Sequence, residues 1–129
     1  NKKKFDLAIS YFEKALRMYK DDVTTIEVLL QTYTEKGAFN EVRRRATEGI
    51  ELFPTQARLY YFAGMANNQM KNFTDALTFL KSGIDFVVDD TDLEMNFNIQ
   101  LGEAYHGLGD QKNKEVHFKK AEQLLKQNK

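Results

Sequence analysis

The stretch Phe12-Glu-Lys-Ala-Leu-Arg-Met-Tyr19 returns twice along the chain in related form. The related segments are Ala46-Thr-Glu-Gly-Ile-Glu-Leu-Phe53 and Leu80-Lys-Ser-Gly-Ile-Asp-Phe-Val87, each 34 residues after the one before. The same spacing separates three phenylalanines: Phe5, Phe39 and Phe73. A fixed period of this length predicts a stacked-repeat solenoid, in which each repeat packs on its neighbours and an extended surface is available for binding.

The composition excludes several classes of protein. The 129 residues fit one domain, and 19 basic residues balance 19 acidic ones, so a nucleic-acid-binding surface is not expected. The absence of cysteine excludes disulfides, thiolate metal sites and cysteine nucleophiles. No apolar run approaches the roughly 20 residues of a membrane-spanning helix, so no membrane insertion is expected. Because the sequence opens at Asn1, the lack of a secretory leader assigns no compartment, and both a cytoplasmic and an exported protein fit.

Apolar residues recur at helical spacing throughout, which predicts an all-α fold. Gly37 and Gly109 fall where turns within helix pairs would need positive φ, and Thr91-Asp-Leu-Glu94 has the form of a capping box. We expect seven helices, near residues 4–19, 22–36, 39–52, 56–70, 73–87, 92–108 and 111–127.

These residues resemble the tetratricopeptide repeat, a 34-residue helix–turn–helix unit. The unit that starts at Val23 carries the family's positions as Ile26, Leu29, Leu30, Tyr33, Gly37, Phe39, Val42, Ala46, Gly49 and Pro54. The unit that starts at Ala57 carries Tyr60, Ala63, Gly64, Phe73, Ala76, Leu80 and Gly83, and the last unit carries Leu101, Gly102, Tyr105, Gly109, Phe118 and Ala121. The departures are Asn67, Val88, Gln111 and Lys114.

The resemblance implies an α–α superhelix of about seven antiparallel helices, roughly three and a half repeats in a single domain over 1–129. We expect residues 1–21 to form the second helix of a first repeat, and 22–55 and 56–90 to form complete repeats. Residues 91–129 would form an atypical terminal repeat with a lengthened first helix.

Two irregularities interrupt the period. The step from the third unit to the fourth is 38 residues, and four extra residues are close to one helical turn. We expect this turn at the start of the sixth helix; the alternative is a longer loop at 88–91. Asp89, Asp90 and Asp92 do not form a calcium loop, because its central Gly and terminal Glu are missing, and they fit acids at a helix N-terminus better.

The chain also opens in the middle of a unit, because Lys2-Lys-Lys-Phe5 has the form of the turn before a second helix. The face formed by Ala8, Tyr11, Phe12 and Ala15 would then lack part of its cover. We expect either further repeats upstream or a homodimer through this N-terminal helix.

In the family that the chain resembles, the first helices of the pairs line a concave groove that binds peptides. Positions that face it at about 100° per residue include an apolar centre, Tyr61, Met65 and Ile99, and a polar rim, Glu27, Gln31, Arg58, Asn68 and Glu103. The resemblance therefore implies a non-catalytic module that binds a protein or peptide segment. The alternatives are a structural or self-association element of a larger polypeptide or assembly, and an accessory domain of an enzyme.

Three other features of the sequence give weaker evidence of a function. The positions at which some family members grip a C-terminal carboxylate are occupied by Glu27, Gln31, Phe62, Asn96 and Gln100, none of them basic, so that clamp is not expected. Arg43-Arg-Arg45 lies on a second helix, where a solvated convex face is favoured over a docking patch for an acidic partner. The two histidines, His106 and His117, have no Asp or Ser in catalytic register, and no enzymatic activity, cofactor or metal is expected.

Overall fold

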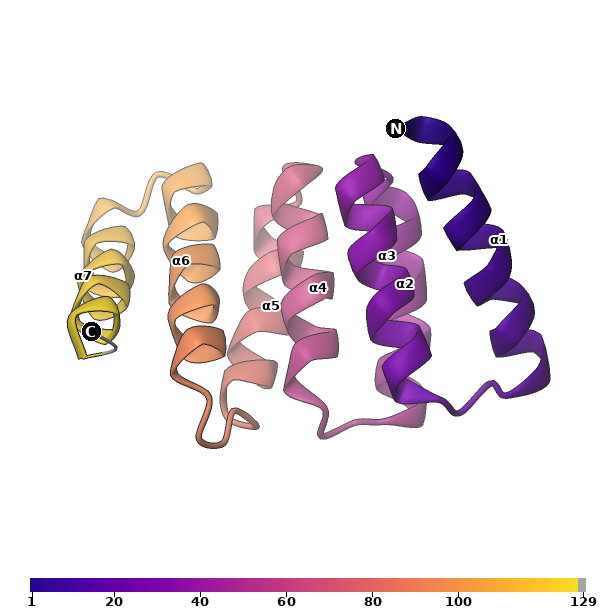
Figure 1. Ribbon diagram of the computed structural model, residues 1–129. Helices are drawn as coiled ribbons and strands as arrows, with labels where there is room; N and C mark the ends of the chain where they lie inside the picture. Colours follow the sequence, from indigo (N-terminus) through magenta and orange to yellow (C-terminus); the bar gives the residue numbers. More distant parts are fainter. Residues whose placement is uncertain (128–129) are drawn as a thin grey trace.

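Seven helices follow one another in an antiparallel row in the computed structural model, which describes residues 1–127 (Figure 1). They are α1 (Lys2–Met18), α2 (Val23–Lys36), α3 (Phe39–Leu52), α4 (Ala57–Gln69), α5 (Phe73–Ile84), α6 (Thr91–Gly107) and α7 (Gln111–Gln127). Each helix packs on the next, and no strand occurs over these residues. The all-α prediction and the helix order are therefore confirmed. α5 ends three residues before its predicted end, because the chain turns there through a bond from the Phe86 amide to the Gly83 carbonyl.

The turns within the helix pairs use one backbone conformation. Gly37 and Gly109 have φ values of +82° and +76°, as the sequence predicts, and both end a helix in the left-handed region. The equivalent position in the middle pair is Lys71, with a φ of +63°. A lysine there bears a steric cost that the two glycines avoid.

α6 contains the four-residue insertion. α2, α4 and α6 begin at Val23, Ala57 and Thr91, so the 34-residue period still holds at the start of α6. α6 is 17 residues long and α4 is 13, so the helix is longer by four residues, as the extra-turn prediction requires. The predicted capping box is wrong: Asp90 is the N-cap, its carboxylate accepts from the Leu93 amide, and Thr91 is already helical.

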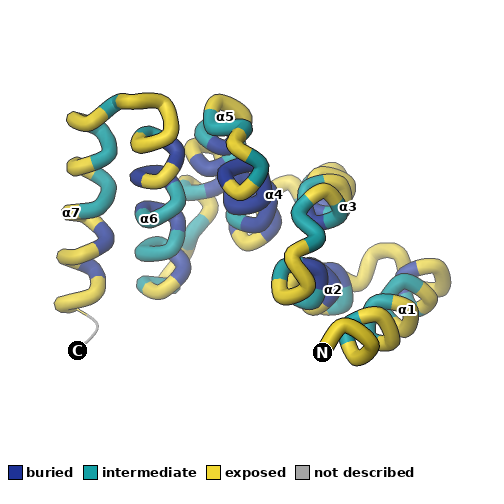
Figure 2. The backbone as a smooth tube through the Cα atoms, turned by 90° about the horizontal axis from the view of Figure 1, so that it is seen from above, coloured by how far each residue is buried: buried dark blue, intermediate teal, exposed yellow. Residues whose placement is uncertain are grey.

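The core consists of two apolar clusters that meet at α4. The first joins α1 to α4 around Leu29, Leu30 and Leu59, and the second joins α4 to α6 around Leu80 and Phe97. Ten of the thirteen residues of α4 are buried, whereas Leu16 is the one buried residue of α1 (Figure 2). α4 is thus the central packing element, and α1 is the least covered.

The helix pairs α2/α3, α4/α5 and α6/α7 stand in the order that the predicted repeats require. The division at 22–55, 56–90 and 91–129 stays a prediction, and residues 128–129 of its last unit lie outside the described residues.

Candidate functional site: the surface of the first helices

The first helices of the three pairs lie beside one another, because α4 contacts both α2 and α6. All eight predicted groove residues belong to them. Glu27 and Gln31 come from α2; Arg58, Tyr61, Met65 and Asn68 from α4; and Ile99 and Glu103 from α6. Gln31, Arg58 and Glu103 are exposed, Glu27, Tyr61 and Ile99 are partly exposed, and Met65 and Asn68 are buried.

The prediction that Met65 is a spare apolar side chain on the surface is wrong. Met65 is 6% exposed and lies in the first apolar cluster. Tyr61 also contributes to packing, because its ring makes edge contacts with Phe62 and Phe97 at centroid distances of 5.6 and 5.9 Å. Burial raises the pKa of the Tyr61 phenol. The apolar centre of the surface is therefore smaller than expected and consists of the exposed parts of Tyr61 and Ile99.

A chain of charged groups crosses one end of the first helices. The Arg58 guanidinium lies 3.6 Å from Glu27 and 3.0 Å from Asp90, and Gln56 donates a 3.3 Å hydrogen bond to Glu27. Because Arg58 is half exposed, each ion pair contributes only about 0.2–1 kcal/mol. Asp90 is a participant that the sequence analysis assigned only to the helix N-terminus. One guanidinium faces two carboxylates, so this group of residues keeps one net negative charge.

The opposite end of α4 and α6 holds a polar depression of about 320 Å³. Its lining is Asn68, Gln69, Lys71, Phe73, Gln100, Glu103, His106 and Gly107. The Asn68 amide nitrogen donates 2.9 Å hydrogen bonds to both the backbone carbonyl and the side-chain oxygen of Gln100. The Asn68 side-chain oxygen is buried and accepts no hydrogen bond from the described residues. The depression brings the predicted rim residues Asn68 and Glu103 together with Gln100, which is not among the eight predicted groove residues.

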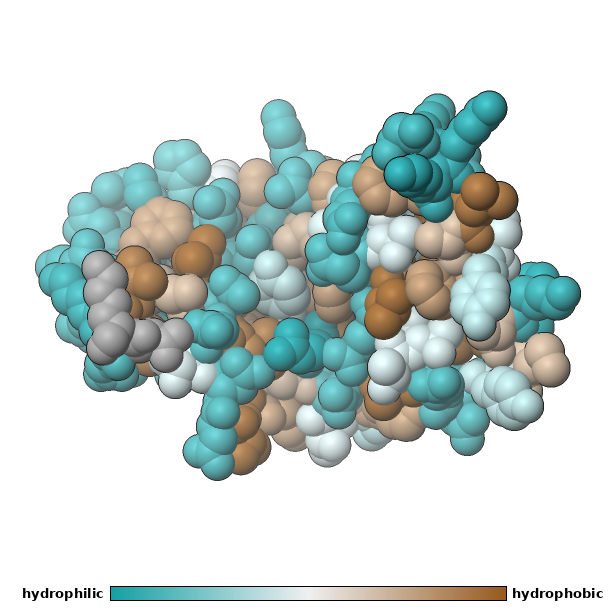
Figure 3. Space-filling model, viewed as in Figure 1, coloured by the Kyte–Doolittle hydropathy of each residue, from teal (hydrophilic) through white to brown (hydrophobic). Residues whose placement is uncertain are grey.

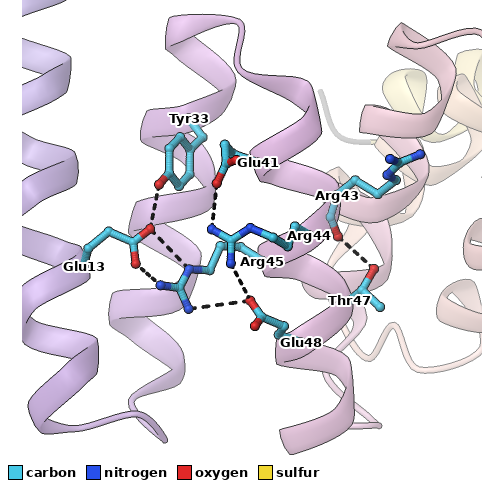
Figure 4. Close-up of polar contacts among 8 residues, drawn as sticks. All are labelled: Glu13, Tyr33, Glu41, Arg43, Arg44, Arg45, Thr47 and Glu48. Atoms are coloured by element: carbon cyan, nitrogen blue, oxygen red, sulfur yellow. Dashed lines mark hydrogen bonds and ion pairs between the residues drawn. The ribbon is translucent and has the colours of Figure 1, made fainter.

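The arginine run 43–45 is mostly neutralised within the fold (Figure 4). Arg44 pairs with Glu41 at 2.6 Å and Glu48 at 3.1 Å, and Arg45 pairs with Glu13 of α1. The Arg43 side chain points away from this cluster in Figure 4. With two of three guanidinium groups paired to carboxylates, the run is a poor docking patch for an acidic partner, but Arg45 is only 24% exposed and so does not belong to the solvated face that was expected.

The two histidines have different surroundings. His117 shares a 2.9 Å hydrogen bond with the Asn98 side chain and stacks on Tyr105 at a centroid distance of 5.5 Å. Burial, together with the charge of Lys81, lowers the pKa of His117. His106 is exposed and lines the polar depression. Within residues 1–127, no set of three His, Cys, Asp or Glu side chains could hold a metal ion, and no helix is long and apolar enough to cross a membrane.

Comparisons with known proteins agree with this architecture. The family profile described as "Tetratricopeptide repeat" matches residues 1–22, whereas none of the curated proteins matches the chain. The solved structure titled "MamA MSR-1 C2" is similar with a TM-score of 0.78 and 17% identity, over 98% of this chain and 70% of that one. "Crystal structure of MamA" has a TM-score of 0.62 at 23% identity, over 96% and 90% of the two chains. "Crystal structure of MamA protein" has 0.63 at 24%, over 95% and 84%.

At these identities the solved structures establish a common fold. Tetratricopeptide repeats generally mediate protein–protein interaction and are typically not enzymes. The 34-residue period, the row of helix pairs and the structural neighbours together establish an α–α solenoid, and its residues 1–22 match the tetratricopeptide-repeat profile.

Proposed function

We propose that the chain is a non-catalytic module that binds an extended protein segment along the surface of α2, α4 and α6. The observation that carries the proposal is the polar depression between α4 and α6, at the end where Asn68 and Gln100 meet. The accessible side-chain amides of Gln69 and Gln100 in its lining offer both donors and acceptors, so they match the alternating N–H and C=O groups of an extended peptide. The depression is too open and too polar to suit a small apolar ligand.

The rest of the surface supports a peptide that runs across the helices. Tyr61 and Ile99 are partly exposed between the depression and the charged chain at Glu27 and Arg58. A small apolar centre with polar groups on both sides is the usual anatomy of a protein-binding patch. Asn68 and Met65 lie beneath this surface, so they would position the residues that contact the partner and not touch it themselves.

Site-specific crosslinking tests the proposal, because the chain has no native cysteine. Glu103→Cys at the depression and Gln31→Cys on α2 would each carry a photo-crosslinker. Glu122→Cys on α7 would serve as the matched control, since that side chain is exposed and lies outside the first helices. The three labelled proteins would be exposed to native cell extract, and the crosslinked products identified by mass spectrometry.

We expect Glu103→Cys and Gln31→Cys to capture the same protein and Glu122→Cys not to capture it. Products that form equally from all three positions, or from Glu122→Cys alone, would exclude the surface of the first helices as the binding site. Light scattering at several concentrations tests the alternative function: a reversible dimer lost in a variant of α1, with no crosslinked partner at Glu103, would indicate a self-association element instead.

A further inference from the structure

α1 carries an apolar stripe on its exposed side. Leu7, Tyr11 and Met18 are 73%, 69% and 67% exposed, and at 100° per residue they lie within about 40° of one another. Tyr19, just beyond the helix end, is 65% exposed. Figure 3 shows hydrophobic atoms at the surface in the region of α1, next to the hydrophilic atoms of its first turn. Single exposed apolar residues are ordinary, but a contiguous stripe on one helix marks an interaction surface.

The repeat-equivalent helices show what this face normally does. Ala8, Phe12 and Ala15 of α1 are each only partly buried. The residues at the same positions in the next two second helices are all buried: Val42, Ala46 and Gly49 in α3, and Ala76, Leu80 and Gly83 in α5. α3 packs between α2 and α4, and α5 between α4 and α6, whereas α1 packs on α2 and reaches α3 through the Glu13–Arg45 ion pair, with no described helix on its other side. Most residues of α1 are therefore exposed or only partly buried (Figure 2).

The charges on α1 are sorted between its two sides. Both of its acidic residues are paired with cations of the next helices: the half-exposed Asp6 pairs with Lys36 of α2 at 2.6 Å, and Glu13 pairs with Arg45 of α3. Its basic residues are exposed and have no ion pair within residues 1–127: Lys2, Lys3, Lys4, Lys14, Arg17 and, just after the helix, Lys20. Lys3, Lys4 and Lys14 lie within about 60° of Leu7 around the helix. The apolar stripe is thus flanked by the unpaired cations Lys3, Lys4 and Lys14, whereas both acidic residues of α1 are already paired with cations of α2 and α3.

We propose that this side of α1 binds an amphipathic α-helix that carries acidic residues on both sides of its apolar face. Ala8 and Ala15 stand two turns apart beside the stripe, and such small residues let a second helix approach closely. Glu or Asp flanks on the incoming helix would pair with Lys3, Lys4 and Lys14, which give the site its charge preference. Two copies of α1 face to face would bring together their unpaired cations, so a second copy of this chain is the less favourable occupant. A membrane surface would attract the same cations, but it would not explain the small residues Ala8 and Ala15, which suit the close approach of a helix.

Synthetic peptides test the proposal on the whole chain. The probe is a helical peptide with Leu at the a and d positions of its heptads and Glu at e and g. The matched controls are the same peptide with Lys in place of Glu, and a scrambled peptide of the original composition. Binding is followed by fluorescence anisotropy, and the contact surface is mapped by amide shifts in NMR spectra of the protein.

We expect the Glu peptide to bind, with shifts confined to α1 and the neighbouring part of α2, and neither control peptide to do so. Tyr11→Glu and Lys14→Glu should each weaken binding by about tenfold or more, because one introduces charge into the apolar stripe and the other reverses a flanking charge. Lys119→Glu on α7 should leave binding unchanged, since it changes the net charge equally at a distant exposed position. Circular dichroism should show the same helix content in all three variants.

Four results would overturn the proposal. The first is equal binding of the Glu and scrambled peptides, and the second is a set of shifts on α2, α4 and α6 without α1. The third is a concentration-dependent dimer, detected by sedimentation, that Tyr11→Glu dissolves. The fourth is binding to phosphatidylglycerol vesicles without binding to the peptide. Because the crosslinking sites Gln31 and Glu103 lie off α1, failure of one proposal leaves the other standing.

Discussion

The first and last junctions of the solenoid place different chemistry at equivalent positions. At the first, the Tyr33 hydroxyl donates a 2.6 Å hydrogen bond to Glu13, which also pairs with Arg45. Two repeat steps along the chain, these positions hold Lys81, Tyr105 and His117. There the Lys81 ammonium lies 5.6 Å from the Tyr105 ring centroid, and His117 stacks on the same ring with an interplanar angle of 9°.

The middle junction shows that neither solution is required by the fold. Its equivalent positions hold Thr47, Asn67 and Phe79, with no aromatic ring at the centre. Asn67 is fully buried, its nitrogen donates to the Ala63 carbonyl, and its oxygen accepts no hydrogen bond from the described residues. The backbone geometry is therefore set by the apolar positions and the turns, while the polar triplet at each junction is free to differ.

The second helices α3 and α5 differ in how closely they approach α4. An added Cβ at Gly83 of α5 would lie 2.2 Å from the Tyr60 Cβ, whereas at the equivalent Gly49 of α3 the nearest atom is a methyl of Leu59 at 3.2 Å. Gly83→Ala should therefore destabilise the protein by about 3 kcal/mol, since overpacking of this kind displaces the backbone and not only a side-chain tip. Urea unfolding followed by circular dichroism measures the change.

Gly49→Ala is the matched control. The Leu59 methyl can shift by a few tenths of an ångström, and alanine is about 1 kcal/mol better than glycine inside a helix, so we expect a net change within about 1 kcal/mol of zero. Equal destabilisation by the two substitutions would mean that α3 and α5 do not differ in how closely they approach α4.

The ionic triplet of the first junction gives the next largest effect. Glu13→Gln should cost about 2 kcal/mol, because the Arg45 guanidinium, which is about three-quarters buried, would keep only the more distant Glu48 carboxylate at 3.7 Å. Thermal unfolding measures the loss. The double variant Glu13→Gln, Arg45→Met should be less destabilised than Glu13→Gln alone, since it removes the buried charge while the new amide oxygen can still accept the hydrogen bond of the Tyr33 hydroxyl. A double variant that is less stable than Glu13→Gln would show that the pair stabilises this junction in a way that apolar contacts do not replace.

The corresponding substitution at the last junction should matter less. Lys81→Met keeps the length of the side chain over Tyr105 but removes its charge, and loss of an exposed cation–π contact costs about 0.5–1 kcal/mol. Chemical unfolding of Lys81→Met beside Glu13→Gln compares the two junctions directly. If Lys81→Met costs as much as Glu13→Gln, the contrast between an ionic and an aromatic junction is wrong.

The sequence predicts the parts of this structure that depend on local chemistry. The seven helices, the left-handed Gly37 and Gly109 and the longer α6 all follow from periodicity, turn residues and the four-residue slip. The cap of α6 does not, because Asp90 and Thr91 are both good caps and only the Arg58 contact and the loop geometry distinguish them.

The exposure of the predicted groove residues is harder to predict, because it depends on how the helices pack and not on local sequence. A helical wheel divides a helix into one inner and one outer face. This division describes α2, which has one side toward solvent. α4 contacts α2, α3, α5 and α6, so its wheel has almost no outer face, and Met65 and Asn68 are buried where a groove was expected. The exposure of a residue on a central helix depends on all four neighbours, and no local pattern contains that information.

His117 makes the last junction sensitive to pH in a way that the first, which has no histidine, is not. Burial and the nearby Lys81 hold its pKa below the ordinary value of 6.5 in the folded state. Between that folded-state pKa and 6.5 the unfolded chain binds more protons, so stability is full above pH 6.5 and declines as the pH falls through this window. The decline should be the smallest effect of the series, since the ring is only partly buried.

Urea unfolding midpoints at pH 7.5 and pH 5.5 measure this decline, and His117→Gln supplies the comparison. Glutamine can still hydrogen-bond to Asn98 but cannot titrate, so the variant should lose less stability than the parent over the same interval. Both proteins keep His106 and every carboxylate, so those groups contribute equally and their effect cancels in the difference. An identical pH dependence in the two proteins would mean that the stacked imidazole is as easily protonated as a free one, and that Lys81 acts on Tyr105 alone.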